Sequence, residues 1–406
     1  MSNYKNHSQL VALLAALCVA GLTTSCRGNK IEYFETSLAD AIVFHVAGTD
    51  GSDTGDAIVS APASRGAMVT TENFANHYEE FGFKAYKHSN CDLLTTSTMT
   101  LSEDENAPAG YYKDCYRTDD DSEWPSEDGG FMPLSFFCWA GSSSFTPNTV
   151  TWTPGEYQAT IVMNEYQVPT KAEEQDDCLL AFTNFVTAQM DGDEMLADAY
   201  IHFSHALTAV TFELGNNVTD GIYINSIDLE GVVGTGTATA VRTIGKNGSG
   251  KGNANVYNNT ADASEEFFSK TGNSITWTPK TTDNTRKFTA TYGTGTDGFK
   301  VQGNQATYSG NSLTKHGACI DTSTDKTHTF MFVPQTIAAD QVTITIHYTF
   351  NGVSHTKSAK IAPYTWERGK IYKYAINLTE QEFVLTLYVQ DWAEGFDYGP
   401  LEGYNW

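Results

Sequence analysis

The chain has 406 residues, of which 24 are Lys or Arg and 49 are Asp or Glu, so its formal charge at pH 7 is −25. Such an acidic surface repels the phosphate backbone of nucleic acids, and a nucleic-acid-binding role is therefore not expected. Hydrophobic residues make up 40% of the chain, which is enough for packed cores and argues against wholesale disorder. Two domains are expected at this length.

The first 25 residues have the features of an export signal. An apolar stretch at residues 10–22 follows a weakly basic start and is too short to span a bilayer. Small residues stand directly before Cys26, as they do at the cleavage site of a bacterial lipoprotein, where the Cys becomes the acylated first residue. Thr23 occupies the place where such sites usually have Leu. The alternative is an ordinary signal peptide with an incidental Cys.

Strand signals dominate residues 31–392. Residues 342–350 alternate apolar and polar side chains, Asn351-Gly352 supplies a type I′ turn, and residues 353–361 return as the second strand of a hairpin. Residues 383–392 form another long alternating strand. Further strands are expected at residues 41–46, 82–87, 135–139, 158–162, 201–214 and 222–229.

Helical periodicity is weak, and short helices are expected only at residues 72–81 and 172–182. Segments rich in Gly, Ser, Asn and Thr predict loops at residues 234–254 and 281–311. Many strands with polar turns and little helix indicate an all-β fold built of β-sandwiches. The acidic turn at residues 191–194 precedes a new run of strands, and a domain boundary is expected near residues 190–200.

No group of residues indicates a metal centre or an active site. Acidic segments at residues 48–56 and 119–129 contain oxygen ligands suited to Ca²⁺ but lack EF-hand spacing, so solvated loops are the preferred interpretation. His202 and His205 stand three apart in an expected strand and would point to opposite faces, which argues against a shared metal. Hydrolase and nucleotide-binding motifs are absent. We therefore expect no enzymatic activity, no metal and no cofactor.

The cysteines do not indicate a zinc site or a complete disulfide framework. Cys18 lies in the signal and Cys26 would carry lipid, which leaves five with irregular spacing and no CxxC pair: Cys91, Cys115, Cys138, Cys178 and Cys319. One or two disulfides are compatible with this number, and the sequence does not pair them.

Arg65 lies in a segment of small residues, 58–68, of the kind that proteases reach easily. An ordinary exposed arginine is the alternative interpretation of this residue.

Eight short segments then occur in a characteristic order. They are SRGA at 64–67, FGFKAY at 81–86, FFCW at 136–139, DCLLA at 177–181, HFSHALTAVTF at 202–212, FVPQ at 332–335, WERGKIYKY at 366–374 and VQDW at 389–392. Together with the lipoprotein-like start at Cys26, they resemble the fimbrillin family of Bacteroidia, the subunits of type V pili. Within these segments, His205, Trp366 and Tyr372 are expected to be packing and turn residues.

The resemblance implies two transthyretin-like β-sandwich domains in tandem. The expected divisions are a signal peptide at 1–25, a propeptide with the first strand at 26–65, domains at 66–195 and 196–395, and a tail at 396–406. The resemblance also implies export as a lipoprotein anchored to the outer membrane through lipid on Cys26. A trypsin-like, Arg-specific protease would then cut between Arg65 and Gly66, although an aliphatic residue or Ala more often follows the arginine.

Cleavage would remove the strand at residues 41–46 and expose unpaired backbone groups. A strand from another pilin subunit, identical or different, would pair there. The candidate donor is the alternating strand near the C-terminus, with Phe383, Leu385, Leu387, Val389 and Trp392 as its apolar residues. Two alternatives remain: this strand is the last core strand of the second domain, or the tail at 393–406 is the donor. Because the subunits carry like charges, we expect assembly to come from strand exchange and not from charge attraction.

A different interpretation is a monomeric surface lipoprotein that binds glycans or a host protein. Exposed Trp124, Trp152 and Trp277 would stack on sugar rings in that case. A secreted hydrolase is the third interpretation, and no constellation of residues supports it.

Overall fold

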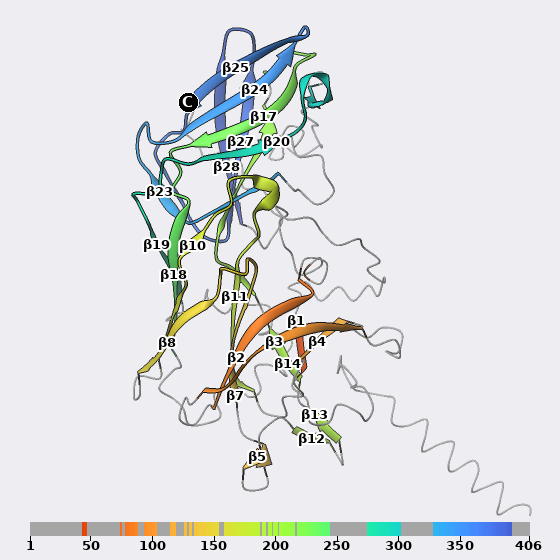
Figure 1. The fold of residues 1–406 in the computed structure, drawn as a ribbon, viewed down its shortest axis with the longest axis vertical. Helices are drawn as coiled ribbons and strands as arrows, with labels where there is room; N and C mark the ends of the chain where they lie inside the picture. Colours follow the sequence, from red (N-terminus) through yellow and green to blue (C-terminus); the bar gives the residue numbers. More distant parts are fainter. Residues whose placement is uncertain are drawn as a thin grey trace, which may run out of the picture.

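A computed structural model (Figure 1) describes residues 43–46, 74, 78–87, 93–103, 114–118, 126–127, 130–131, 134–153, 158–186, 189–191, 194–196, 198–201, 203–215, 217–243, 274–301 and 328–391. Nearly all of them lie in β-strands or in the turns between strands, so the expected all-β fold is confirmed. Within these ranges there is no helix of the length and hydrophobicity that crossing a membrane requires.

The largest sheet has eight strands and lies mostly in the lower half of Figure 1. Its order is β14 (Asp198–Ile201), β1 (Val43–Val46), β4 (Asp114–Thr118), β3 (Leu93–Glu103), β2 (Glu80–Lys87), β7 (Leu134–Ala140), β11 (Leu179–Val186) and β15 (Ser204–His205). Neighbouring strands are antiparallel except β1 and β14, which are parallel. The first strand that the structure describes is therefore an interior strand of this sheet.

A five-stranded sheet joins segments from both halves of the sequence. Its path is β10 (Tyr166–Gln167), β18 (Thr235–Thr243), β9 (Gln158–Met163) and β8 (Pro147–Thr153), and β19 (Ser274–Pro279) pairs with the other side of β18. Ladders between β18 and β9 thus cross the expected boundary near residues 190–200. The division into two tandem domains stays a prediction.

Two sheets form a sandwich in the upper half of Figure 1. The first has the order β22 (Phe330–Phe332), β16 (Thr208–Leu214), β27 (Lys370–Leu378) and β28 (Phe383–Asp391). The second has the order β20 (Lys287–Thr291), β17 (Tyr223–Glu230), β24 (Thr343–Phe350) and β25 (Val353–Lys360), with β21 (Phe299–Lys300) on β17. The predicted hairpin is confirmed as β24 and β25, and Asn351 and Gly352 have the positive φ angles of 52° and 75° that its turn requires.

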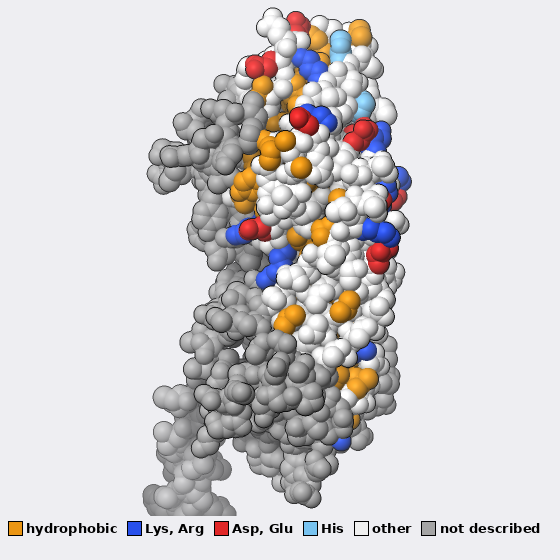
Figure 2. All heavy atoms as spheres, turned by 90° about the vertical axis from the view of Figure 1, so that its left-hand side faces the viewer, with side chains coloured by type: hydrophobic (Ala, Val, Ile, Leu, Met, Phe, Trp, Pro, Cys, Tyr) orange, Lys and Arg blue, Asp and Glu red, His pale blue; other side chains and the backbone are white. Residues whose placement is uncertain are grey.

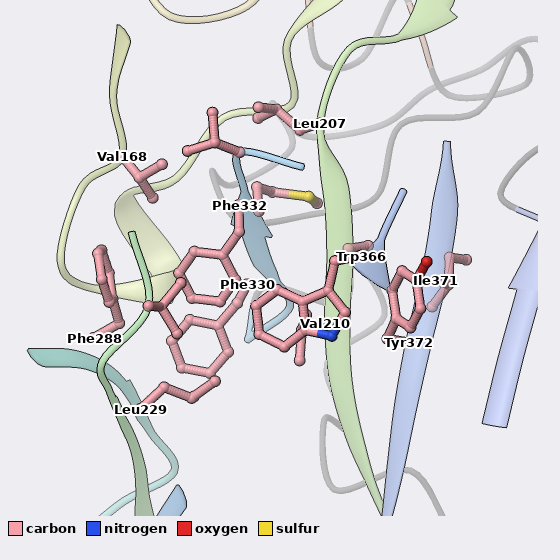
Figure 3. Packing of buried hydrophobic residues seen from close by; sticks show 14 of the residues in the cluster. Val168, Leu207, Val210, Leu229, Phe288, Phe330, Phe332, Trp366, Ile371 and Tyr372 are labelled. Atoms are coloured by element: carbon pink, nitrogen blue, oxygen red, sulfur yellow. The ribbon is translucent and has the colours of Figure 1, made fainter. Parts of the chain in front are cut away.

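Aromatic side chains fill the space between these two sheets (Figure 3). Phe332 stacks on Trp366 with ring centroids 5.7 Å apart and meets Phe288 edge-on at 5.0 Å. Leu229 and Phe288 come from one sheet, and Val210 comes from the other. All five side chains are buried, and Phe332 of β22 contacts Phe288 of the opposite sheet.

The helix expected at residues 172–182 is wrong. Only the 3₁₀ helix η2 (Ala172–Glu174) forms, and β11 begins at Leu179 and pairs with β7. A continuous apolar run such as Leu179–Phe182 does not distinguish a buried strand from a buried helix, and here the pairing with β7 decides for the strand. The helix expected at 72–81 is limited in the described residues to the turn in which Tyr78 N donates to Phe74 O at 2.9 Å, and β2 begins at Glu80.

Both expected loops contain strands. β18 occupies the start of the segment 234–254. The close packing of β18 against Val333 explains the glycine at position 236, because a Cβ there would come within 2.9 Å of Val333 Cγ1. β20, the 3₁₀ helix η4 (Gly295–Asp297) and β21 occupy the segment 281–311. Small and polar residues predicted loops there, but pairing with distant strands overrode the composition.

The single strand expected at residues 201–214 is divided. β14 ends at Ile201, β15 is two residues long, and β16 begins at Thr208. Three small ladders complete the described strands: β5 (Ser126–Glu127) with β6 (Gly130–Phe131), β12 (Gln189–Asp191) with β13 (Glu194–Leu196), and β23 (Gln335–Ile337) with β26 (Tyr364–Trp366).

Candidate functional site at the junction of the motifs

The segment Phe203–Thr208 links the lower sheet to the upper sandwich, and three distant segments bind its backbone. Ala206 N donates to Cys178 O at 2.7 Å, and Trp277 Nε1 donates to Ala206 O at 2.6 Å. Gly369 N donates to Leu207 O at 2.9 Å. The DCLLA, FSHALT and WERGK motifs, which are far apart in the sequence, therefore meet at one place.

Asp177 and His205 form the polar centre of this junction. His205 Nδ1 lies 2.7 Å from Asp177 Oδ2, with the aspartate side chain fully buried and the histidine 14% exposed. Tyr78 Oη donates to Asp177 O at 2.6 Å. Burial, and next the negative charge of Asp177, raise the pKa of Tyr78 well above its usual value, so its hydroxyl stays protonated and can donate.

Among its described residues, the junction provides no set of side chains that would bind a metal ion. His205 is engaged by Asp177, and His202 lies outside the described residues. Among the residues that the structure describes, no three His, Cys, Asp or Glu side chains are grouped as a metal would require. The acidic segment 48–56 falls outside these residues, as does nearly all of 119–129, where only the backbone of Glu127 and its neighbour Ser126 is described.

The FVPQ and WERGK motifs are also in contact. β23 pairs with β26 so that Gln335 is opposite Trp366. The buried Gln335 amide accepts from Val233 N at 2.9 Å and donates to the carbonyl oxygens of Val233 and Val333 at 3.0 and 2.9 Å. This side chain therefore joins the link between β17 and β18 to the end of β22.

Trp366 and Tyr372 are packing and turn residues, as expected. Both are buried, and Trp366 Nε1 donates to Tyr374 Oη at 3.2 Å. Tyr372 Oη accepts from Glu367 N at 2.7 Å and donates to Thr365 O at 3.0 Å, which fixes the turn before β27. Gly369 takes a φ of +64° in this turn, a conformation that favours glycine.

The candidate donor residues other than Trp392 lie in β28, which is an edge strand of the upper sheet among the described strands. β28 pairs with β27 over its whole length, from Phe383 opposite Leu378 to Asp391 opposite Lys370. Leu385 and Leu387 are buried in the sandwich, while Phe383 and Val389 are partly buried. Trp392 and the tail at 393–406 lie outside the described residues.

The strand expected in the propeptide is present as β1. Residues 43–46 pair in parallel with residues 198–201 of β14, and Val43 and Phe44 pair with Arg117 and Tyr116 of β4. Cys26, Arg65 and Gly66 lie outside the described residues, so lipidation and cleavage at these positions stay predictions.

Two of the remaining cysteines are resolved as free, buried thiols: Cys138 in β7 and Cys178 before β11. Cys115 belongs to β4, and Cys91 and Cys319 lie outside the described residues.

The structure does not favour the glycan-binding interpretation at Trp277. Its ring is partly buried, stacks on Phe145 at 6.0 Å and donates to Ala206 O, so it serves the junction. Trp152 lies in β8, and Trp124 lies outside the described residues.

The pair of Asp177 and His205 is not predicted by the sequence, although both residues stand in motifs that the sequence singles out. The sequence signal for this contact was the order of the DCLLA and FSHALT segments. Their pairing, with Leu179 opposite His205, is seen in the ladder between β11 and β15. A spacing rule within one segment cannot find partners that are 28 residues apart.

Comparisons with known proteins place the chain in a family. The sequence profile of a family described as fimbrillin-like matches residues 124–392, about two thirds of the chain. No curated protein sequence matches the chain.

Several solved structures are distantly similar. The tip fimbrial protein Mfa3 from Porphyromonas gingivalis is 8% identical, with a TM-score of 0.33, and the similarity covers 87% of this chain and 100% of that one. The fimbrial anchor protein Mfa2 from the same organism is 8% identical, with a TM-score of 0.29 and coverages of 89% and 99%. A fimbrial assembly protein from Parabacteroides distasonis is also 8% identical, with a TM-score of 0.34 and coverages of 87% and 94%.

The sequence profile spans the candidate donor strand and six of the eight motif segments completely, from FFCW to VQDW. SRGA and FGFKAY precede the matched residues. By this match, the chain belongs to the fimbrillin-like family.

Proposed function

We propose that the chain is a structural subunit of a cell-surface pilus that serves adhesion. It is exported as a lipoprotein precursor through Cys26, reaches the outer membrane, is cut after Arg65 and assembles with other pilin subunits by donor-strand exchange. Membership of a family of structural, non-enzymatic proteins agrees with this role. The observation that carries the proposal is the position of β1, because this strand precedes Arg65 and lies inside the eight-stranded sheet.

An interior position makes β1 a suitable strand to exchange. Its loss would leave unpaired N–H and C=O groups on two strands at once, β14 on one side and β4 on the other. A replacement strand would form ladders with both neighbours, whereas a strand that adds to a sheet edge forms only one. A donor of about ten residues would bury about five side chains, each contributing about 1.5–3 kcal/mol before ordering costs.

The other arginines within the described residues are poor sites for an Arg-specific protease. Arg117 is paired on both sides, with Val43 of β1 and Thr100 of β3, and Arg242 is paired with Ala159 of β9. Arg286 and Arg368 are both held by hydrogen bonds to backbone oxygens, of Val168 and His205 respectively. Proteases prefer exposed backbone free of such pairing. Arg27 and Arg65 are the remaining arginines.

The two candidate donors differ in what assembly requires. If β28 is the donor, it must first leave β27 and expose Leu385 and Leu387. If the tail at 393–406 is the donor, β28 keeps its place and no ladder among the described residues has to break.

The proposal is tested in cells that express the protein. We expect Arg65→Gln to abolish filaments seen by electron microscopy and to leave an uncleaved precursor, while the matched control Arg27→Gln keeps both cleavage and filaments. N-terminal sequencing of wild-type filament subunits should give Gly66 as the first residue. A wild-type subunit that begins at Cys26 in every filament would contradict the processing step, and Cys26→Ser with normal surface delivery would contradict the lipid anchor.

A further inference from the structure

The outer face of one upper sheet, the one formed by β20, β17, β24, β25 and β21, is rich in hydroxyl groups. Neighbouring residues of a strand point to opposite faces, and residues opposite each other in a ladder share a face. Ile227, Ile344 and Phe288 point into the buried core. The outer face therefore consists of every second residue of 343–349, 354–360, 287–291 and 226–230, together with Tyr223 and Lys300. We call it the hydroxyl face, because nine of its sixteen residues are Ser or Thr and none is aliphatic.

The hydroxyl face is accessible and nearly neutral. Among its residues only Asp228 and Thr349 are buried. It extends about 20 Å along the strands and about 14 Å across them. It carries three Lys against Asp228 and Glu230, a formal charge of +1, whereas the whole chain carries −25. Figure 2 shows the upper end of the molecule largely in white, the colour of uncharged polar side chains and backbone, with acidic and basic side chains close together.

A hydrogen-bonded network crosses the hydroxyl face from β20 to β25. Its centre is the buried Asp228 carboxylate, whose Oδ1 accepts from Thr289 Oγ1 at 2.7 Å and whose Oδ2 lies 2.8 Å from His347 Nε2. Lys287 Nζ donates to the same Oδ2 atom at 3.1 Å. On the other side of the imidazole ring, Thr356 Oγ1 lies 3.2 Å from His347 Nδ1. Four strands thus contribute to one network.

This network fixes which groups face the solvent. A carboxylate only accepts hydrogen bonds, so His347 Nε2 donates to Asp228, and Nδ1 of the neutral ring then accepts from the Thr356 hydroxyl. Thr289 donates to Asp228 in the same way, so Thr289 and Thr356 present oxygen acceptors to the solvent, while Lys287 presents N–H donors. Burying a carboxylate costs free energy, and a face that met only water would not require one. The fixed pattern suits a ligand that both donates and accepts hydrogen bonds.

We propose that the hydroxyl face binds a neutral glycan, with sugar hydroxyls bonded to its Ser and Thr residues and one sugar ring stacked on Tyr223. A sugar hydroxyl donates and accepts hydrogen bonds as Ser and Thr do, so the two surfaces match without any charge. The Tyr223 ring offers an apolar surface to the C–H groups of a sugar. Lys300 Nζ lies 5.9 Å from the centre of this ring, so a sugar would displace only an exposed lysine side chain. This assignment rests on the proposed adhesive function, for which it supplies the class of ligand.

The composition of the hydroxyl face argues against other classes of ligand. The centre of a protein–protein interface is usually apolar and depleted of charged residues, and no aliphatic side chain is present on this face. Nucleic acids and acidic glycans would be repelled by the formal charge of −25 on the chain. Neutral glycans meet neither obstacle.

The proposed pilus would strengthen the binding of such a ligand. A single hydroxyl face binds weakly, because its hydrogen bonds to a sugar replace hydrogen bonds to water. In a pilus every copy carries one such face, and linked sites can raise the overall affinity by about 10²–10⁴-fold without any new contact. Assembly therefore provides the multivalency that this kind of site requires.

The test is the binding of purified full-length protein to the neutral polysaccharides dextran, mannan and xylan, with polygalacturonate as the acidic comparison. Migration in native gels that contain each polysaccharide detects weak binding. We expect at least one neutral polysaccharide to retard the protein and polygalacturonate to have no effect. If no neutral polysaccharide retards the protein, or if polygalacturonate alone does, the proposed ligand is wrong.

Two double variants locate the binding site. Thr343→Val with Thr345→Val removes two hydroxyls from the face in β24, and Thr276→Val with Thr278→Val removes two exposed hydroxyls from β19. Val resembles Thr in shape and favours strands, so the fold is expected to be kept. The first pair should weaken binding about fivefold or more, and the second should change it less than about twofold. Equal effects would contradict binding at the hydroxyl face.

A measurement on the wild-type protein does not depend on the folding of variants. His347 lies on the hydroxyl face, whereas the exposed His355 stacks on Tyr348 on the opposite face of the sheet, with ring centroids 5.3 Å apart. Hydroxyl-radical footprinting with the bound polysaccharide should protect Tyr223 and His347 and leave His355 unchanged. Any other pattern of protection would overturn the proposed site.

The outcomes for the ligand and for the pilus are separable. A protein that binds neutral glycans at this face but forms no filaments would contradict the proposed function and retain the ligand. Filaments that bind no neutral glycan would contradict the ligand and leave the proposed function intact.

Discussion

His205 Nδ1 lies 2.7 Å from Oδ2 of Asp177, and this contact joins the segment before β16 to the start of β11. The carboxylate is fully buried, and its Oδ1 atom has no hydrogen-bond partner in the structure. The aspartate therefore depends on His205 for its only side-chain partner among the described contacts.

Replacing His205 with Ala should destabilise the protein by about 3–5 kcal/mol, because it leaves a buried carboxylate without its partner. The free energy of unfolding in urea measures the loss. The double variant with Asp177→Ala should be more stable than His205→Ala alone, since the unpaired charge is then removed. If the double variant is less stable than His205→Ala by the full cost of a second cavity, the Asp177 carboxylate and His205 do not stabilise each other.

Gln335→Ala should cost about 3 kcal/mol in the free energy of unfolding. The buried amide makes three hydrogen bonds to backbone groups of Val233 and Val333, and each unsatisfied group costs about 1–3 kcal/mol. Thr336→Ala is the matched control on the neighbouring, exposed residue and should cost less than about 0.5 kcal/mol. An equal decrease in the free energy of unfolding for the two variants would show that the Gln335 amide does not stabilise the contact between the segments of Val233 and Val333.

Gly369→Ala should destabilise the protein by about 1–2 kcal/mol through backbone strain, because the residue has a φ of +64°. An added Cβ would meet no atom within 4 Å, so steric overlap is not the cause. Gly369→Asn is the control, since Asn adopts this conformation more readily and should cost less. Thermal unfolding of the two variants would distinguish strain from a general intolerance of side chains at this turn.

Phe74→Ala should lower stability by about 3 kcal/mol, because the buried ring stacks on Phe203 with centroids 4.9 Å apart. This contact holds the chain just before β2 against the segment that follows β14. Val353→Ala removes an apolar side chain that is 57% exposed and should change stability by less than about 0.5 kcal/mol. Urea unfolding of both variants gives the comparison, and a small loss for Phe74→Ala would mean that the ring is not anchored.

Asp228 should make the stability of the upper sandwich depend on acid pH. Burial alone would raise the pKa of Asp228, but hydrogen bonds from Thr289, His347 and Lys287 outweigh it and hold the pKa below its usual range. A group whose pKa is lower in the folded state contributes stability above its unfolded pKa. That contribution is lost as the pH falls through the lower, folded value.

Asp228→Asn should therefore reduce stability at neutral pH and flatten the decline in stability below about pH 4. Urea unfolding at a series of pH values measures the slope. Lys287→Gln removes one of the groups that lower the pKa, and should give an intermediate slope. An unchanged slope in the Asn variant would show that other groups cause the acid dependence.

The parts of the fold that the sequence predicted are those that local patterns determine. The hairpin of β24 and β25 follows from strict alternation and an Asn-Gly turn, and the turn before β27 follows from Trp366 to Gly369. β18 was missed, because its Thr, Ala and Gly residues have a loop-like composition and its partner β9 lies far away in the sequence. The small size of Ala238 and Ala240 suits a buried strand between two others.

The candidate site was predicted in its components and not in its arrangement. The sequence singled out the motifs that contain Asp177, His205 and Gln335, but the hydrogen bonds that join them depend on the folded chain. The helix predicted at 172–182 was wrong for the same reason, because the local pattern does not contain the pairing with distant residues. η2 ends at Glu174, and the ladder with β7 determines that a strand follows.

The ladder between β9 and β18 also sets an order of events during biosynthesis. A ribosome synthesises the chain from its N-terminus, so β8 and β9 emerge well before Thr235–Thr243. Until then, the inner edge of their sheet has no partner, and an unfinished edge invites pairing with other chains. The five-stranded sheet therefore stays incomplete until β18 and β19 have been added, and association with other chains is favoured until then.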